Sequence, residues 1–274
     1  MEARLQRRVQ RYGWDHAAAC YDDCWRDALA PATDHLLKLA ALVAGERVLD
    51  VACGTGAISL AAARAVGARG SVLGVDISQK MVDAAAGTAA ALGYSHCRFE
   101  RCGAEELPET GASFDAVLCG LGLMYVPEPE RALSLMAARL APGGRLVASV
   151  WGMRSRCGWA GVFPIIDARV ESDVCPLFFR LGTGDALAAA FAAAQLRDIV
   201  VERFATVLAY ESAQEACKAA LQGGPVALPY SRFDEKVRAE VDAEYLESIA
   251  PFRHSEGYQI PGEFVVVRGT RDGH

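Results

Sequence analysis

Two acidic residues and a pair of glycines carry the clearest chemical signal in the sequence. Asp50 lies four residues before Gly54, in the run Asp50-Val51-Ala52-Cys53-Gly54-Thr55-Gly56. Glycine permits backbone angles that are closed to other residues, so a turn built on it can approach a ligand closely. Asp76 follows 20 residues after Gly56, the spacing at which an acidic side chain meets ribose hydroxyls in dinucleotide folds. These residues predict a site for a ligand that contains a nucleoside.

The surrounding sequence predicts the elements that position these residues. Residues 48–52 form a short apolar run typical of a buried strand, and the alanine-rich segment 58–65 predicts a helix. A strand, a glycine turn and a helix begin a doubly wound α/β unit, in which the ligand lies at the carboxyl ends of the strands. Asp76 ends a second predicted strand, 71–76. The alternative role for Asp76 is to cap the helix predicted at 79–92.

Further strands and helices alternate along the chain. Strands are predicted at 97–101, 114–119 and 146–151, and a helix is predicted at 128–140. Two later strands, at 199–210 and 264–269, are expected to pair antiparallel at the sheet edge. This pattern predicts an α/β protein with a doubly wound, seven-stranded, mostly parallel sheet.

Two common glycine motifs do not fit the turn. Position 59 is Ser, so the third glycine of the dinucleotide fingerprint is absent, and no Gly-Lys-Ser/Thr follows to make a phosphate loop. Taken alone, Gly54-Thr55-Gly56 is equally compatible with a strand-to-helix turn that binds nothing.

Four segments together resemble class I S-adenosylmethionine-dependent methyltransferases, in particular the ubiquinone and menaquinone biosynthesis group of small-molecule enzymes. These are Asp50-Val51-Ala52-Cys53-Gly54-Thr55-Gly56, Gly74-Val75-Asp76-Ile77-Ser78-Gln79-Lys80-Met81, Gly103-Ala104-Glu105-Glu106-Leu107-Pro108 and Leu140-Ala141-Pro142-Gly143-Gly144. The resemblance is close over residues 46–151 and loose elsewhere. It implies a Rossmann-like core that binds S-adenosyl-L-methionine and releases S-adenosyl-L-homocysteine. The cofactor-binding residues that it implies are Tyr21, Trp25, Asp50, Ala52, Cys53, Gly54, Gly56, Asp76, Ile77, Met81, Gly103, Ala104, Glu105 and Cys119.

The chain departs from the family pattern at two positions. Gly103 stands where many relatives carry Asp, so no side chain there reaches the adenine amino group; the backbone of Ala104 remains, and Glu105 becomes the nearest carboxylate. Gly120 stands where many relatives carry Asn or Gln, so no amide is offered there to orient a substrate.

We expect three parts: an N-terminal helical lid (1–45), the core (46–210 and 261–270) and a helical cap insertion (211–260). In the first part, residues 1–30 read as a helix with Trp14, Tyr21 and Trp25 on one face, and Pro31 begins a second helix. The pair Tyr21-Asp22 resembles one that lies over the methionine end of the cofactor in similar enzymes. Simple packing of these aromatic residues is the alternative.

The resemblance implies methyl transfer by in-line displacement, catalysed mainly by proximity and orientation. The candidate substrate residues are Gly120, Leu121, Leu123, Met124, Trp151 and Tyr230. Their apolar, aromatic character predicts a small, partly hydrophobic acceptor: a phenol, a quinone-like ring or an N-heterocycle. If the acceptor must lose a proton, His16, His254, Glu256 and Tyr21 are the candidate bases.

Composition excludes several other functions. The net charge of −6 disfavours nucleic acid as a partner, and Arg4, Arg7, Arg8 and Arg11 are expected on a solvated helix face. The nine cysteines form no C-x-x-C pair and no apolar run reaches eighteen residues, so we expect a cytoplasmic protein without a membrane span or metal site. Two alternatives stay open: an arsenite methyltransferase using Cys157, Cys175 and Cys217, and a non-catalytic S-adenosylmethionine-binding protein. A homodimer is also left open.

Overall fold

The computed structural model describes residues 3–107, 113–171, 175 and 177–273. Pro108, the last residue of the third resembling segment, lies outside this part. The strands are β1 (Arg47–Val51), β2 (Ser71–Asp76), β3 (Cys97–Arg101), β4 (Phe114–Gly120), β5 (Leu140–Trp151), β6 (Arg197–Tyr210), β7 (Arg253–His254) and β8 (Gly257–Thr270). The α-helices are α1 (Ala3–Ala17), α2 (Tyr21–Ala40), α3 (Ala57–Val66), α4 (Gln79–Ala91), α5 (Pro129–Ala138), α6 (Val162–Asp167), α7 (Ala186–Ala193), α8 (Ala213–Leu221), α9 (Ala227–Arg232) and α10 (Glu235–Ser248).

The sheet has the order β3-β2-β1-β4-β5-β8-β6, and the short strand β7 pairs only with the start of β8. Strands β1 to β5 run parallel, and β8 lies antiparallel between β5 and β6. The predicted doubly wound, mostly parallel sheet and its antiparallel edge pair are therefore confirmed. The order reverses between β1 and β4, and α/β sheets bind ligands at the carboxyl end of such a reversal.

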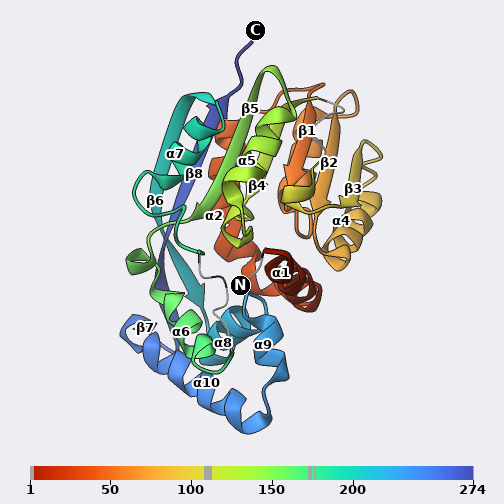
Figure 1. Ribbon diagram of the computed structural model, residues 1–274. Helices are drawn as coiled ribbons and strands as arrows, with labels where there is room; N and C mark the ends of the chain where they lie inside the picture. The colour runs from red at the N-terminus through yellow and green to blue at the C-terminus, as the bar shows by residue number, and fades with distance from the viewer. Residues whose placement is uncertain (1–2, 108–112, 172–174, 176, 274) are drawn as a thin grey trace.

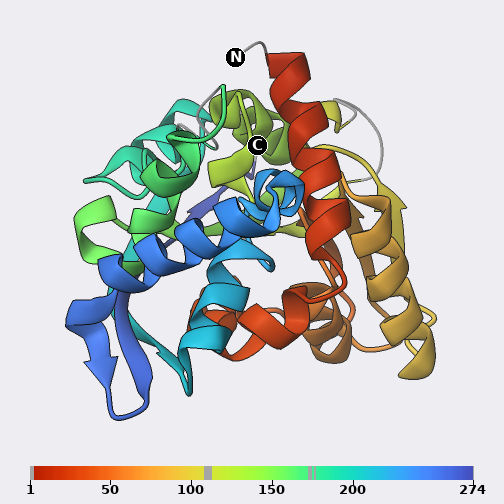
Figure 2. The same cartoon turned by 90° about the horizontal axis from the view of Figure 1, so that it is seen from below.

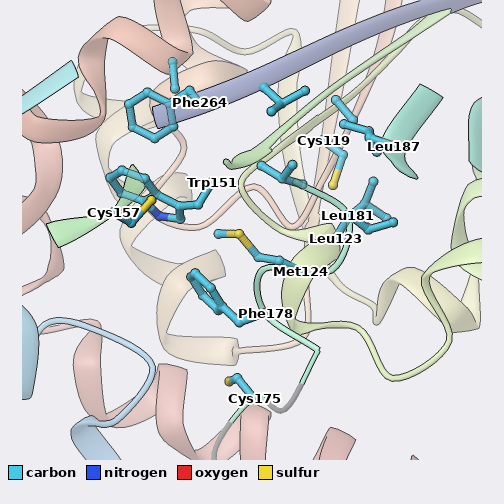
Figure 3. Close-up of a cluster of buried hydrophobic side chains, with 14 of the residues drawn as sticks. Cys119, Leu123, Met124, Trp151, Cys157, Cys175, Phe178, Leu181, Leu187 and Phe264 are labelled. Atoms are coloured by element: carbon cyan, nitrogen blue, oxygen red, sulfur yellow. The ribbon is translucent and has the colours of Figure 1, made fainter. Parts of the chain in front are cut away.

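Helices cover both faces of the sheet (Figure 1). On one face, α2 and α3 pack Leu36 and Ala62 onto Val48 of β1 and Leu118 of β4. The other face is packed by α5, α7 and the segment after β5, and its cluster contains most of the buried aromatic side chains. Figure 3 shows part of this second cluster, with Trp151 and Phe264 from adjacent strands beside Met124 and Phe178. Because both faces are covered, the central strands read as continuous apolar runs.

The N-terminal helices differ from the prediction. The helix predicted through residue 30 breaks at residues 18–20, and Pro31 lies inside α2 instead of beginning a helix. A proline inside a helix removes one backbone hydrogen bond, and the burial of Ala32, Leu36 and Ala40 against the sheet offsets that loss. Trp14 therefore lies on α1 while Tyr21 and Trp25 lie on α2, so the three do not share one helical face.

Other boundaries shift by a few residues. The fifth strand begins at Leu140, because the Pro142-Gly143-Gly144 turn is absorbed as an irregularity in its pairing with β4. The last strand begins at Gly257 instead of residue 264. Helices α8, α9 and α10 gather with α1 at the carboxyl end of the parallel strands (Figure 1). Within the described ranges, no helix is both long and apolar enough to cross a membrane.

Candidate active site

The turn after β1 exposes backbone to a cavity. Gly54 has φ of 54°, and a Cβ built there would meet no atom within 4 Å, so it faces open space. Gly56 has φ of 93°, and a Cβ there would lie 3.0 Å from the Cβ of Ala85 on α4. The first glycine therefore opens the turn toward a ligand, whereas the second lets α3 and α4 approach each other and lines none of the cavities described below.

Asp76 holds this turn in place. Its Oδ2 accepts a hydrogen bond from the Gly54 N–H at 3.0 Å, and its Oδ1 accepts one from the Ser78 N–H at 2.8 Å. Burial raises the pKa of its carboxyl to about 6, against the lowering effect of these two bonds. Each carboxylate oxygen has a second lone pair, so Asp76 can accept two ligand hydroxyls without giving up the turn.

Asp50 has a different place. It is fully buried beneath the turn, where its Oδ2 accepts a hydrogen bond from the Ser59 hydroxyl at 2.6 Å. Burial, together with the nearby charge of Asp76, raises the pKa of this carboxyl to about 7, against the lowering effect of the Ser59 hydrogen bond. Asp50 does not line the ligand space, so it supports the turn from below.

Three cavities meet at the carboxyl ends of the strands, and Tyr21 and Leu121 line all of them. The first cavity, of about 750 Å³, is lined by Arg7, Gln10, Trp14, Tyr21, Ala52, Gly54, Asp76, Ile77, Met81, Cys102, Gly103, Ala104, Glu105, Gly120, Leu121, Gly122, Tyr125, Val126 and Pro127. It thus brings together nine of the fourteen cofactor residues that the resemblance implies. The second cavity, of about 1040 Å³, lies over the turn and adds Trp25 and Cys53. Cys119 is fully buried in β4 and lines none of the three.

The third, which we call the aromatic cavity, is the smallest of the three. It is lined by Trp14, Tyr21, Trp25, Leu29, Leu121, Met124, Tyr125, Trp151, Trp159, Gly224 and Pro225. Of the candidate substrate residues, Leu121, Met124 and Trp151 line it, and Gly120 lines the two other cavities. Leu123 is fully buried, and the hydroxyl of Tyr230 donates a hydrogen bond to Asp242 at 2.8 Å; neither lines a cavity described here.

Two of the strained backbone positions lie where the cavities meet. Ala52 and Leu121 have φ of 58° and 56°, a left-handed conformation that residues with side chains seldom adopt. Gly122 follows Leu121, and a Cβ there would lie 2.4 Å from the Cβ of Ala52. The turn after β1 and the turn after β4 therefore lie in close contact. Strained backbone of this kind is often found at functional sites.

Glu105, the carboxylate expected nearest to position 103, lines the first cavity but is already paired. Its Oε2 lies 3.1 Å from Nη1 of Arg7 on α1, and its Oε1 accepts a hydrogen bond from the Glu128 N–H at 2.9 Å. Arg7 likewise is not the freely solvated residue that the sequence suggested. At Gly103 the backbone N–H donates a hydrogen bond to the Glu106 carboxylate at 3.2 Å. Gly103 has no side chain, so only its backbone faces the first cavity.

Polar contacts fasten the N-terminal helices over the site. Besides Arg7, Asp15 of α1 accepts a hydrogen bond from the Ser78 hydroxyl at 2.6 Å, and Asp22 of α2 accepts one from the Thr55 hydroxyl at 2.6 Å. Figure 2 shows α1 running across the carboxyl end of the strands, next to α4. Trp14 meets Tyr21 at 5.9 Å and Tyr125 at 4.9 Å between ring centroids, and closes the aromatic cavity. The sequence had singled out Trp14 for the lid but not Tyr125 or Trp159, because nothing local to either marks it.

The candidate bases fall into two groups. His16, His254 and Glu256 are exposed and line none of the cavities described here, so the structure does not bring them to the site. Tyr21 lies where the cavities meet, but burial raises the pKa of its phenol well above the ordinary value of 10.0. The same holds for Tyr125. Both hydroxyls therefore stay protonated at neutral pH.

The cysteines proposed for an arsenite site do not converge. Within the described part of the chain, no three metal-binding side chains form a cluster. Burial raises the pKa of Cys157 to about 11 and those of Cys175 and Cys217 to about 12. All three thiols therefore stay protonated at neutral pH in this structure.

Comparison with known proteins agrees with this geometry. A family model described as a methyltransferase domain matches residues 42–160. Aklanonic acid methyltransferase DauC of Streptomyces sp. (strain C5) is 31% identical over 153 residues, which cover 56% of this chain and 67% of that enzyme. The chain belongs to the S-adenosylmethionine-dependent methyltransferases. Its cofactor is S-adenosyl-L-methionine, and it is an enzyme of the transferase class.

Other relatives are matched over different shares of their length. The ubiquinone/menaquinone biosynthesis C-methyltransferase UbiE of Azotobacter vinelandii is 36% identical over 138 residues, which span 48% of this chain and 54% of that enzyme. Among solved structures, the YcgJ protein of Bacillus subtilis has a TM-score of 0.61 at 17% identity, covering 89% of this chain and 99% of that one. The phosphoethanolamine N-methyltransferase 2 of Haemonchus contortus, solved with S-adenosylhomocysteine, has a TM-score of 0.60 at 16% identity, covering 94% and 57%. At these identities the solved structures show the fold alone.

Proposed function

We propose that this methyltransferase transfers a methyl group to a small, partly hydrophobic aromatic acceptor held in the aromatic cavity. The observation that carries the proposal is that this cavity adjoins the two cavities over the glycine turn and shares Tyr21 and Leu121 with both. Among the described residues that line it, none carries a charged side chain. The relatives named above act on aklanonic acid and in ubiquinone and menaquinone biosynthesis, which is consistent with an acceptor of this kind.

The described residues fit the cofactor. Asp76 has lone pairs for two ribose hydroxyls, and Gly54 leaves open space above the turn. Ile77 and Met81 offer apolar contact for an adenine ring, and Gly103 and Ala104 offer backbone to its edge. The second cavity, beside Cys53 and Trp25, has room for the amino-acid end. Asp50, Gly56 and Cys119 do not line the three cavities, and we propose that they affect cofactor binding only by holding the turns after β1 and β4 in place.

When bound, the cofactor supplies an electrophilic methyl group carried by a sulfonium. The part of this chain is to bring the acceptor in line and to exclude water, which in well-aligned systems contributes up to about 7–11 kcal/mol. Tyr21 and Leu121 stand at the junction where such alignment is set. Since Tyr21 and Tyr125 stay protonated, the acceptor must be nucleophilic by itself or arrive as its anion. We also propose that residues 1–45 act as the lid and residues 211–260 as a cap over the acceptor.

Calorimetric titration with S-adenosylhomocysteine, followed by a transfer assay with radiolabelled cofactor, tests this function. We expect the wild type to bind and Asp76→Ala to bind at least tenfold more weakly. Methyl transfer should then appear with phenols or quinols and be absent with polar amines of similar size. Cofactor binding together with transfer only to polar or macromolecular acceptors would overturn the proposal.

A further inference from the structure

Arginine side chains from two separate elements line a groove that adjoins the first cavity. We call it the basic groove, and its arginines are Arg4, Arg7, Arg8 and Arg11 of α1 and Arg101 at the end of β3. The rest of its lining is Leu5, Ile77, Cys102, Gly103 and Glu106. The groove is larger than any of the three cavities at the carboxyl ends of the strands. The proposed function assigns no role to it.

The positive charge of the groove follows from the sequence of α1 and from the packing of the helix. Arg4, Arg8 and Arg11 succeed one another at intervals of four and three residues, which places them on one helical face. Arg101 reaches the same groove from the end of β3, and Figure 2 shows α1 on the side of the molecule where β3 and α4 lie. Positive charge therefore gathers at one place on a chain whose net charge is −6.

The described part of the chain supplies little negative charge to balance this cluster. Arg7 is paired with Glu105, but no ion pair is formed by the other four, Arg4, Arg8, Arg11 and Arg101. Glu106 brings the only acidic side chain among the described residues of the lining, and its carboxylate accepts a hydrogen bond from the Gly103 N–H. Like charges at these helical spacings repel each other, so contacts among the described residues do not explain the cluster, whereas a bound anion would.

The chemistry of arginine indicates the kind of anion. A guanidinium group presents planar, paired donors that match the oxygens of a phosphate group. A cleft lined by one sign of charge also concentrates small ions of the opposite sign. A long polyanion such as nucleic acid would extend past the groove over a surface of negative net charge, which disfavours it. A compact anion with several phosphate groups fits the cluster better, because it can engage arginines of both elements at once.

We propose that the basic groove binds a small anion bearing two or more phosphate groups, and that this anion bridges α1 to the end of β3. The groove and the first cavity share Arg7, Ile77, Cys102 and Gly103, so the bound anion lies next to the first cavity. Neutralising the arginines removes the repulsion between α1 and Arg101 and holds α1 over the cofactor. This site lies apart from the aromatic cavity and does not depend on which acceptor is methylated.

The direct test is calorimetric titration with inorganic pyrophosphate, without cofactor and at an ionic strength of about 0.15 M. Arg8→Gln and Arg101→Gln each remove one charge from the groove, one on either element. Arg64→Gln is the matched control, because Arg64 is an exposed arginine of α3 that forms no ion pair with a described residue and lines none of the cavities described here. All three substitutions change the net charge equally.

We expect the wild type to bind pyrophosphate, and to bind orthophosphate and citrate at least about fivefold more weakly. Arg8→Gln and Arg101→Gln should each weaken pyrophosphate binding about fivefold, and Arg64→Gln less than about twofold. No binding by the wild type, or an equal loss in Arg64→Gln, would overturn the proposal. Citrate that binds as tightly as pyrophosphate would overturn the assignment to phosphate. A single-stranded oligonucleotide that binds and is not displaced by pyrophosphate would assign the groove to nucleic acid instead.

A second measurement tests the bridge between α1 and β3. Pyrophosphate at a concentration that saturates the wild type should slow S-adenosylhomocysteine release about threefold, measured by stopped-flow displacement. Arg101→Gln lacks the β3 end of the bridge, so it should release the cofactor product at nearly the same rate with and without pyrophosphate. A wild-type rate that pyrophosphate leaves unchanged would show that the anion does not join the two elements.

Discussion

Arg7 and Glu105 join the N-terminal helix to the turn after β3, with Nη1 and Oε2 3.1 Å apart. The Glu105 side chain is only 3% exposed, whereas that of Arg7 is 28% exposed. The pair crosses the rim of the first cavity, since both residues line it. If the N-terminal helices act as the lid proposed above, they must release this contact, or move with it, each time the cofactor enters or leaves.

Arg7→Ala is expected to speed cofactor release. The substitution leaves the buried Glu105 carboxylate without its cation, which destabilises the closed lid, and we expect the dissociation rate of S-adenosylhomocysteine to rise about tenfold. Arg8→Ala removes the same charge from the exposed side of the same helix and should leave the rate within twofold. Stopped-flow displacement measures both rates. Equal rates in the two variants would show that the contact does not hold the lid.

The pKa of Asp76 predicts how cofactor binding depends on pH. Its carboxyl titrates near pH 6, raised from 3.8 mainly by burial, so above pH 7 it is ionised and accepts hydrogen bonds from ribose hydroxyls. Below pH 6 it is protonated and loses that capacity. We expect the Kd of S-adenosylhomocysteine to be flat from pH 7 to 8 and to rise about tenfold by pH 5.

Asp76→Asn is the control for this pH profile, because an amide does not titrate. The variant should bind weakly at every pH and should show no step between pH 5 and pH 7 in calorimetry. A step of the same size in the variant would assign the titration to another group, with Asp50 as the first candidate.

Asp50 should make the protein less stable as the pH rises. Burial raises the pKa of its carboxyl in the folded state from 3.8 to about 7, so the folded state binds more protons than the unfolded state between these values. The free energy of unfolding therefore falls as pH increases through this window. Asp50→Asn removes the ionisation, and from pH 5 to pH 8 its stability relative to the wild type should improve by about 3 kcal/mol.

Urea unfolding of both proteins at pH 5 and pH 8 measures this change in relative stability. A loss of packing in Asp50→Asn lowers its stability equally at both pH values, so it does not affect the change. Asp34→Asn, an exposed change on α2, should show no such dependence. An unchanged difference between wild type and Asp50→Asn from pH 5 to pH 8 would mean that Asp50 stays ionised when folded.

Local sequence sufficed to predict the glycine turn at the centre of the candidate site, but it failed to predict how the N-terminal helices lie over it. The glycine turn and Asp76 could be predicted because each is fixed by neighbours a few residues away in one strand-turn-helix unit. The break at residues 18–20 could not, because His16-Ala17-Ala18-Ala19 favours a continuing helix. The helices separate there, and contacts such as Trp14 with Tyr125 and Arg7 with Glu105 join residues about a hundred positions apart. The histidines were misplaced for the same reason, since no local pattern shows which face of a helix or hairpin meets the site.

Gly122→Ala tests whether the close approach of the two turns shapes the cofactor site. A Cβ at this position would lie 2.4 Å from the Cβ of Ala52 and 3.1 Å from Sγ of Cys119. The first of these atoms is attached directly to backbone that is already strained, so the turn after β1 must move. We expect S-adenosylhomocysteine affinity to fall at least tenfold and the melting temperature to drop. Gly87→Ala lies in α4 with no atom within 4 Å of the new methyl, so it should stabilise the helix by about 0.5–1 kcal/mol and leave affinity unchanged. Calorimetry and thermal unfolding of both variants give the comparison, and an unaltered affinity in Gly122→Ala would show that the cofactor does not depend on this contact.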